Sequence, residues 1–92
     1  EPPLLLDIRD EETFQRQHVA GALNIPTDLL PDSLERLPQD RESPIVTICN
    51  RGNMSLTGML VLNSLGYTRV RSLNGGTFGW AEVDGPVEGS EA

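Results

Sequence analysis

The chain has 92 residues, which is enough for one domain with a modest hydrophobic core. Its 14 acidic and 7 basic residues give a net charge of −7, so the surface repels a phosphate backbone and no nucleic-acid binding is expected. No apolar stretch is long enough to cross a bilayer, so no membrane association is expected either.

The amino-terminal half predicts two strands and several short helical turns. The apolar run over residues 4–8 is typical of a buried parallel strand. Asp10 precedes two glutamates and is a good helix N-cap, which predicts a short helix to about residue 17. Residues 23–25 predict a brief strand that ends at Pro26. Leucines at positions 29, 30, 34 and 37 predict helical turns before Pro38.

The carboxyl-terminal half carries the clearest strand of the sequence. Residues 45–49 form a β-branched run after Pro44, and a helix is expected over residues 55–65. The core candidates of that helix are Leu56, Met59, Leu60 and Leu62. Gly66 is expected to end it. A strand over residues 70–73 and a short helix over residues 77–83 follow, and residues 88–92 are expected to be a disordered tail.

This alternation of strands and helices predicts a single α/β domain over residues 1–92. The expected architecture is a small, mostly parallel sheet with helices on both faces. In such sheets, ligands bind beyond the carboxyl ends of the strands. Cys49 falls at that end of the clearest strand, so it is the leading candidate for a functional residue.

Cys49 is also the only cysteine, and His18 is the only histidine. An internal disulfide and a zinc site of clustered cysteine and histidine are therefore excluded. No metal or other cofactor is expected. A lone cysteine suits a reducing cytoplasm, which is the expected location.

The segment after Cys49 has the features of an anion-binding loop. Gly52 lets the backbone curl closely around the sulfur, and a helix begins at about Ser55. The free N–H groups and the positive end of that helix favour a thiolate, and they also suit a persulfide or a sulfonate. A buried structural cysteine needs neither feature, so the functional interpretation is favoured. Arg51 is either an anion-binding group or a solvated surface arginine.

Three stretches of the sequence resemble the rhodanese family. Cys49-x-x-Gly52-x-x-Ser55 is similar to its active-site loop. The upstream stretch comprises Asp7-Ile8-Arg9, Phe14, His18-Val19 and Gly21-Ala22-Leu23-Asn24-Ile25-Pro26. The downstream stretch comprises Leu73-Asn74-Gly75-Gly76 and Trp80. They occur in the family's order and together span nearly the whole chain.

The resemblance implies a sulfurtransferase of the thiosulfate type. The thiolate of Cys49 would take the outer sulfur of thiosulfate or a related donor, release sulfite and hold a persulfide. A thiol, a protein or cyanide would then accept the sulfur. The implied catalytic residue is Cys49, and the implied substrate-binding residues are Asn50, Arg51, Gly52, Asn53, Met54 and Ser55. Arg9 and His18 are expected to be structural.

The sequence also departs from the family pattern. Asn50 and Met54 stand where many members carry basic residues, which predicts weak binding of thiosulfate. The family usually has a further strand and helix before the Asp-x-Arg strand, so the sheet is expected to lack that edge strand unless residues precede this sequence.

The sequence is also compatible with two alternative functions. The chain could be a sulfur carrier or an adaptor module within a larger sulfur relay. It could also be a cysteine phosphatase, a class that includes members with the rhodanese fold. Those enzymes clamp the phosphoryl group with an arginine that closes the loop, but positions 54–56 are Met, Ser and Leu.

Overall fold

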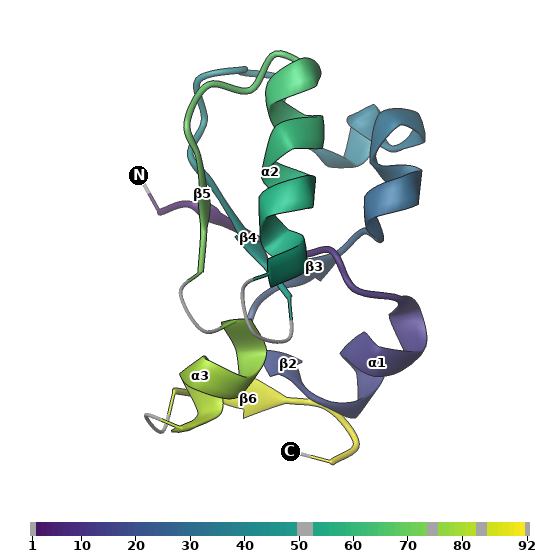
Figure 1. Cartoon of the computed structure of the whole chain (residues 1–92), viewed down its shortest axis with the longest axis vertical. Coiled ribbons are helices and arrows are strands. Elements are labelled where there is room, and N and C mark those ends of the chain that lie inside the picture. Colours follow the sequence, from purple (N-terminus) through teal and green to yellow (C-terminus); the bar gives the residue numbers. More distant parts are fainter. Residues whose placement is uncertain (1, 50–52, 74–75, 83–84, 92) are drawn as a thin grey trace.

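The structure is a computed structural model that describes residues 2–49, 53–73, 76–82 and 85–91, with the backbone alone at 53–55, 78 and 82. A four-stranded parallel sheet lies at its centre, in the order β3-β1-β4-β5 (Figure 1). Its strands are β1 (Leu4–Asp7), β3 (Leu23–Asn24), β4 (Ile45–Ile48) and β5 (Val70–Ser72). Among the described residues, no strand lies beyond β5.

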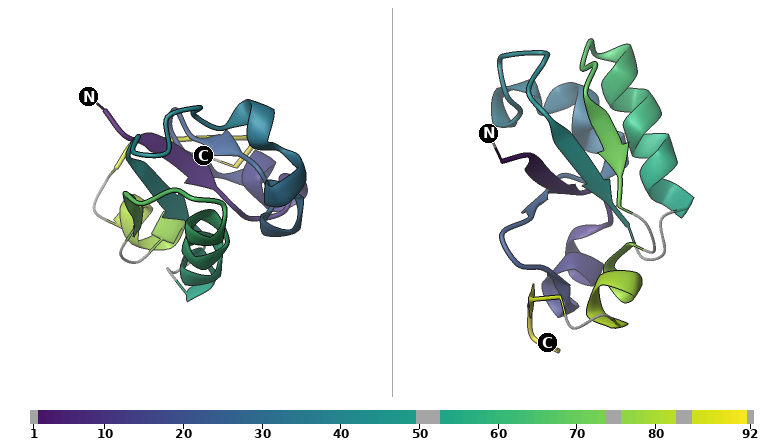
Figure 2. Two further views of the ribbon diagram at one scale, coloured as in Figure 1. Left: turned by 90° about the horizontal axis from the view of Figure 1, so that it is seen from above. Right: turned by 90° about the vertical axis from the view of Figure 1, so that its left-hand side faces the viewer.

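The helices are not distributed evenly over the sheet. They are α1 (Glu11–Arg16), the 3-10 helices η1 (Thr27–Asp32) and η2 (Leu34–Arg36), α2 (Asn53–Ser64) and α3 (Gly76–Glu82). α2 packs against β4, β5 and η1, whereas α1 and α3 lie beyond the carboxyl ends of the strands (Figures 1 and 2).

The predicted α/β fold, with a mostly parallel sheet flanked by helices, is confirmed. On the side of β4 and β5 opposite α2, no helix covers the sheet within the described residues (Figure 2). Val46 is half-buried there and Arg71 is exposed.

The hydrophobic core fills the space between the sheet and α2. Its buried members are Leu6, Ile8, Ile25, Leu30, Leu37, Ile45, Cys49, Leu62 and Tyr67. The inward stripe of α2 consists of Gly58, Val61 and Leu62, and Leu65 continues it just after the helix, at the spacing expected for one helix face. The prediction that Leu56 and Leu60 are core residues is wrong, because this stripe turns them outward, where they are 52% and 65% exposed.

A second, smaller sheet joins distant parts of the chain. β2 (His18–Val19) pairs antiparallel with β6 (Val87–Glu88). Farther on, the amide groups of Ser90 and Glu91 donate to the carbonyl groups of Gln15 and Arg16, at 2.9 and 2.8 Å. These backbone bonds connect residues 88–91 to β2 and α1.

None of the helices in the described part of the chain is both long and apolar enough to span a membrane.

Candidate active site

Cys49 directly follows β4, at the carboxyl edge of the parallel sheet. Its side chain is 1% exposed and belongs to the main core cluster. α2 begins at Asn53, so the strand, the cysteine and the amino end of a long helix follow one another closely in the chain. This is the arrangement that the sequence predicts.

The other predicted site residues directly follow Cys49 in the sequence. Asn50, Arg51 and Gly52 lie outside the described residues. The backbone of Asn53, Met54 and Ser55 forms the first turn of α2. These residues were predicted to bind substrate, and their individual roles stay predictions.

Two backbone hydrogen bonds fix the position of the cysteine. The amide of Ile8 donates to the carbonyl oxygen of Ile48 at 3.1 Å, which continues the pairing of β1 with β4 up to Cys49. The amide of Thr77, in the first turn of α3, donates to the carbonyl oxygen of Cys49 at 2.7 Å. The nucleophile candidate is therefore held from one side by β1 and from another by α3.

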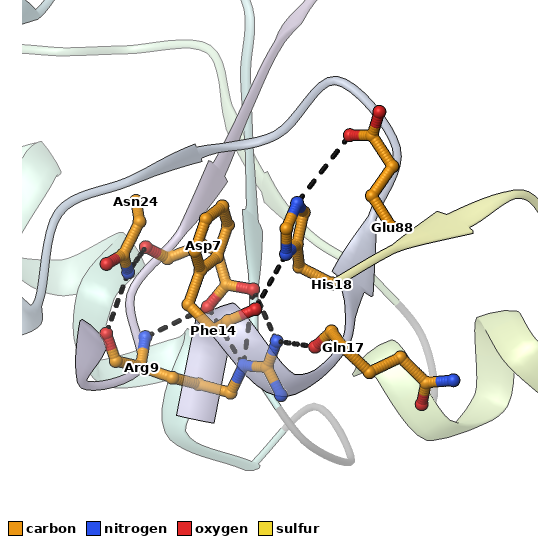
Figure 3. A network of polar contacts seen from close by, with 7 residues as sticks. All are labelled: Asp7, Arg9, Phe14, Gln17, His18, Asn24 and Glu88. Atoms are coloured by element: carbon orange, nitrogen blue, oxygen red, sulfur yellow. Dashed lines mark hydrogen bonds and ion pairs between the residues drawn. The ribbon is translucent and has the colours of Figure 1, made fainter. Parts of the chain in front are cut away.

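A polar network around Asp7 braces the same edge of the sheet (Figure 3). The buried guanidinium of Arg9 donates through Nε and Nη2 to the carboxylate of Asp7, with an Nη2–Oδ2 distance of 2.8 Å. Nη2 also donates to the carbonyl oxygen of Gln17 at 2.7 Å. The amide group of Asn24 donates to the carbonyl oxygens of Asp7 and Arg9. The end of β1 is thereby tied to β3 and to Gln17, the residue before β2.

His18 lies beside this network and contacts structural groups through both ring nitrogens (Figure 3). A carbonyl oxygen only accepts, so Nδ1 donates to the carbonyl oxygen of Phe14 at 2.6 Å. The ring stacks on Phe14, and Nε2 lies 3.6 Å from a carboxylate oxygen of Glu88. These contacts support the structural interpretation of Arg9 and His18.

Two surface hollows lie at opposite ends of the sheet. One of about 460 Å³ lies at the carboxyl end of β1 and is lined by Ile8, Arg9, Asp10, Thr13, Pro26, Thr27 and Asp28. Ile8 connects it to the site, because its backbone bonds to the residue before Cys49. A larger hollow of about 650 Å³ lies at the amino ends of β4 and β5, away from the cysteine. Of these two hollows, the smaller one therefore lies at the same end of the sheet as Cys49.

Within the described ranges, no three or more His, Cys, Asp or Glu side chains are grouped to hold a metal ion.

The sequence alone does not predict that Thr77 contacts Cys49. Thr77 was expected only to begin a helix, yet its side chain is fully buried and its amide binds the Cys49 peptide. Nothing in its local sequence marks this contact, since it joins residues that are far apart in the chain. The Gly75-Gly76 pair before it was the available signal, because it predicts a tight turn.

Comparison with known proteins assigns the chain to a family. The family model for the rhodanese-like domain matches residues 1–83. The chain belongs to the rhodanese-like domain family.

Relatives and a solved structure agree with this assignment. The rhodanese-like domain described here is 38% identical over 79 residues to thiosulfate sulfurtransferase GlpE of Tolumonas auensis, covering 86% of this chain and 73% of that protein. It is 34% identical over 88 residues to adenylyltransferase and sulfurtransferase UBA4 of Meyerozyma guilliermondii, covering 88% of this chain and 21% of that protein. The rhodanese-like domain of an Anabaena protein has a similar solution structure, with a TM-score of 0.89, 28% identity, and coverage of 99% of this chain and 69% of that chain.

The predicted rhodanese family, the α/β fold and the sulfurtransferase class are thus confirmed. The persulfide and the role of each residue stay predictions.

Proposed function

We propose that this rhodanese-like domain moves a sulfane sulfur through a persulfide on Cys49. The donor is thiosulfate or a related compound, and the acceptor is a small thiol, a protein thiol or, in an assay, cyanide. The observation that carries the proposal is the position of Cys49, the only cysteine, between the carboxyl end of β4 and the amino end of α2. Thiosulfate is taken as donor because a relative of 38% identity is named for it.

The reaction has two displacements at sulfur. The thiolate of Cys49 attacks the outer sulfur of thiosulfate, a new S–S bond forms, and the old one breaks with its electron pair leaving on sulfite. The acceptor thiolate then attacks the outer sulfur of the persulfide, and the Cys49 thiolate leaves. Charge on the donor and on the persulfide would be stabilised by the loop over residues 50–55, with the Ser55 hydroxyl as a further donor.

The sulfur chemistry is tested by an intact-protein mass spectrum after incubation with thiosulfate. We expect the protein to gain the mass of one sulfur atom and to lose it on treatment with dithiothreitol. Cys49→Ser is the matched control and gains nothing. A wild-type protein that stays unmodified with thiosulfate and with a low-molecular-weight persulfide would contradict the proposal.

A second candidate is a sulfur carrier that acts within a larger assembly. It is favoured by the match to UBA4, in which this chain corresponds to 21% of the protein. An independent enzyme turns over many donor molecules with thiosulfate and cyanide, whereas a carrier loads once and releases sulfur only to its partner. Steady-state thiocyanate production separates the two.

Two further expectations belong to this proposal. No steady phosphate release from an aryl phosphate is expected, because positions 54–56 lack the arginine that a cysteine phosphatase requires. A reducing compartment such as the cytoplasm is proposed, since the Cys49 thiol has to escape oxidation between turnovers.

A further inference from the structure

One buried hydroxyl in the described part of the chain has no hydrogen-bond partner, and it belongs to Thr77. The residue is 0% exposed, so its hydroxyl forms no hydrogen bond with bulk solvent. An unpartnered buried hydroxyl is unfavourable, and nearly all such groups in folded proteins are satisfied. Valine has the same shape and would avoid this penalty. The hydroxyl therefore calls for an explanation other than packing.

The position of Thr77 connects this hydroxyl to the reaction. Its amide donates to the carbonyl oxygen of Cys49 at 2.7 Å, so the residue lies against the peptide that carries the sulfur. The amide of Gly76 donates to the carbonyl oxygen of Leu73 at 3.1 Å, which connects the start of α3 to the residue after β5.

A second buried threonine in the same region provides the contrast. Thr47 lies in β4, the strand that leads to Cys49, and it is also 0% exposed. Its hydroxyl donates to the carbonyl oxygen of Arg71 at 3.3 Å. Of these two equally buried threonines, only the one that contacts the Cys49 peptide has an unused hydroxyl.

We propose that the Thr77 hydroxyl is the hydrogen-bond partner of the sulfur that Cys49 carries, and that it is satisfied only in the persulfide form. The inference rests on the proposed persulfide and names a residue that stabilises it. The added sulfur brings lone pairs into the site and accepts a hydrogen bond from the hydroxyl. The unpartnered hydroxyl raises the free energy of the unloaded protein, and loading removes that penalty. Thr77 thus shifts the equilibrium toward the loaded form.

The equilibrium of sulfur loading tests this assignment. The protein is incubated with thiosulfate at a series of sulfite concentrations, and the loaded fraction is read from intact mass spectra. In Thr77→Val we expect the loading constant to fall about tenfold, the effect of one hydrogen bond to a charged sulfur. Thr77→Ser keeps the hydroxyl and should stay close to wild type.

Thermal unfolding separates this role from a purely structural one. Thr77→Val removes the unpartnered hydroxyl, so its unloaded form should unfold at the wild-type temperature or above it. Loading should raise the unfolding temperature of wild type more than that of Thr77→Val. Thr47→Val is the matched control: it loses a hydrogen bond and should unfold earlier, yet load sulfur like wild type. If Thr77→Val does not fold, the same loading defect must appear in Thr77→Ala relative to Thr77→Ser.

The failure of this inference is distinguishable from the failure of the proposed function. If wild type loads sulfur and the folded variant without the hydroxyl loads equally well, Thr77 does not stabilise the persulfide and the inference is wrong. The same conclusion follows if Thr77→Ser loads as poorly as Thr77→Val. If wild type itself never loads, the persulfide proposal fails, and this inference fails with it.

Discussion

At the scale of single residues, the ion pair between Asp7 and Arg9 is the contact that shapes the carboxyl edge of the sheet. Both side chains are at least 95% buried, and Arg9 also reaches the carbonyl oxygen of Gln17. Removal of one partner leaves a buried charge without compensation. We expect Arg9→Ala to lower the free energy of unfolding by about 3 kcal/mol in urea denaturation.

An exposed arginine serves as the control for this prediction. Arg16 pairs with Glu12 and Glu91, and all three side chains are more than half exposed. Exposed pairs of this kind contribute from about 0 to 1 kcal/mol, so Arg16→Ala should have a small effect. Equal losses in the two variants would mean that the buried pair does not stabilise the fold in the way proposed.

At the scale of elements, the approach of α2 to β1 depends on a glycine. A Cβ atom at Gly58 would lie 2.8 Å from Cδ1 and 3.2 Å from Cγ2 of Ile8. Alanine favours the helix by about 1 kcal/mol, while overpacking costs about 1–3 kcal/mol, so Gly58→Ala should be destabilising on balance. Ile8→Val removes Cδ1, the nearer atom.

The combination of these two substitutions is the informative measurement. In Gly58→Ala with Ile8→Val, the clash at 2.8 Å is gone and the gain in helix propensity remains. A double-mutant cycle should therefore show a favourable coupling of about 1 kcal/mol. Strictly additive losses would mean that α2 shifts away from β1 instead of pressing on Ile8.

The contact of the carboxyl-terminal segment with α1 can be tested with a pair of glycines. Gly89 has φ +124°, and a Cβ atom there would lie 2.6 Å from the carbonyl oxygen of Arg16, a backbone atom that cannot move aside easily. Gly21 has φ +84° with nothing within 4 Å, so Gly21→Ala carries backbone strain alone.

We expect Gly89→Ala to expose the amides of Ser90 and Glu91 to hydrogen exchange, while Gly21→Ala leaves them protected. These amides bond to the carbonyl groups of Gln15 and Arg16, and the clash would break that contact. If the same amides exchange freely in wild type, the segment is a disordered tail, as the sequence alone predicted.

The sequence predicts elements well where the signal is local. The strand around residues 45–48 and the helix after Cys49 follow from β-branched residues, a glycine-bearing loop and a stop at Gly66. It fails where the deciding contact joins distant residues. No periodic pattern in the sequence predicts the pairing of Val19 with Val87. The hydrogen bond from the Thr77 amide to the Cys49 carbonyl is likewise found only in the three-dimensional structure.

Leu56 and Leu60 illustrate a different limit of sequence-based prediction. Both are apolar and lie one turn apart on α2, so composition favours burial. The helix instead turns Gly58 and Leu62 toward the sheet, because the smallest side chain permits the closest approach to Ile8. A glycine in a helix carries no hydrophobic signal, so the prediction is right for Leu62 but wrong for Leu56 and Leu60.

At the scale of the whole molecule, the net negative charge of the protein opposes the binding of thiosulfate, the proposed donor. The net charge is −7, and the molecule measures 33 × 23 × 22 Å. Screening lengths are about 30 Å at 0.01 M salt and about 8 Å at 0.15 M, so at low salt the acidic residues repel a dianion from across the molecule. The KM for thiosulfate should therefore fall as ionic strength rises in this range. A KM that rises with salt would show that local cations dominate.

Two single-charge substitutions separate the effect of local charge from that of net charge. Met54→Arg adds a cation in the first turn of α2, and Glu42→Gln removes an acid from the exposed loop before β4. Each raises the net charge by one unit, but only the first acts beside Cys49. We expect Met54→Arg to lower the KM for thiosulfate up to about tenfold, equivalent to about 1.4 kcal/mol, with kcat changed less. Glu42→Gln should leave the KM for thiosulfate unchanged at 0.15 M salt. Arg51→Ala should raise this KM. If Met54→Arg and Arg51→Ala both leave KM unchanged, side-chain charge does not govern donor choice. A donor without a sulfonate, such as a protein persulfide, then fits this site better than thiosulfate.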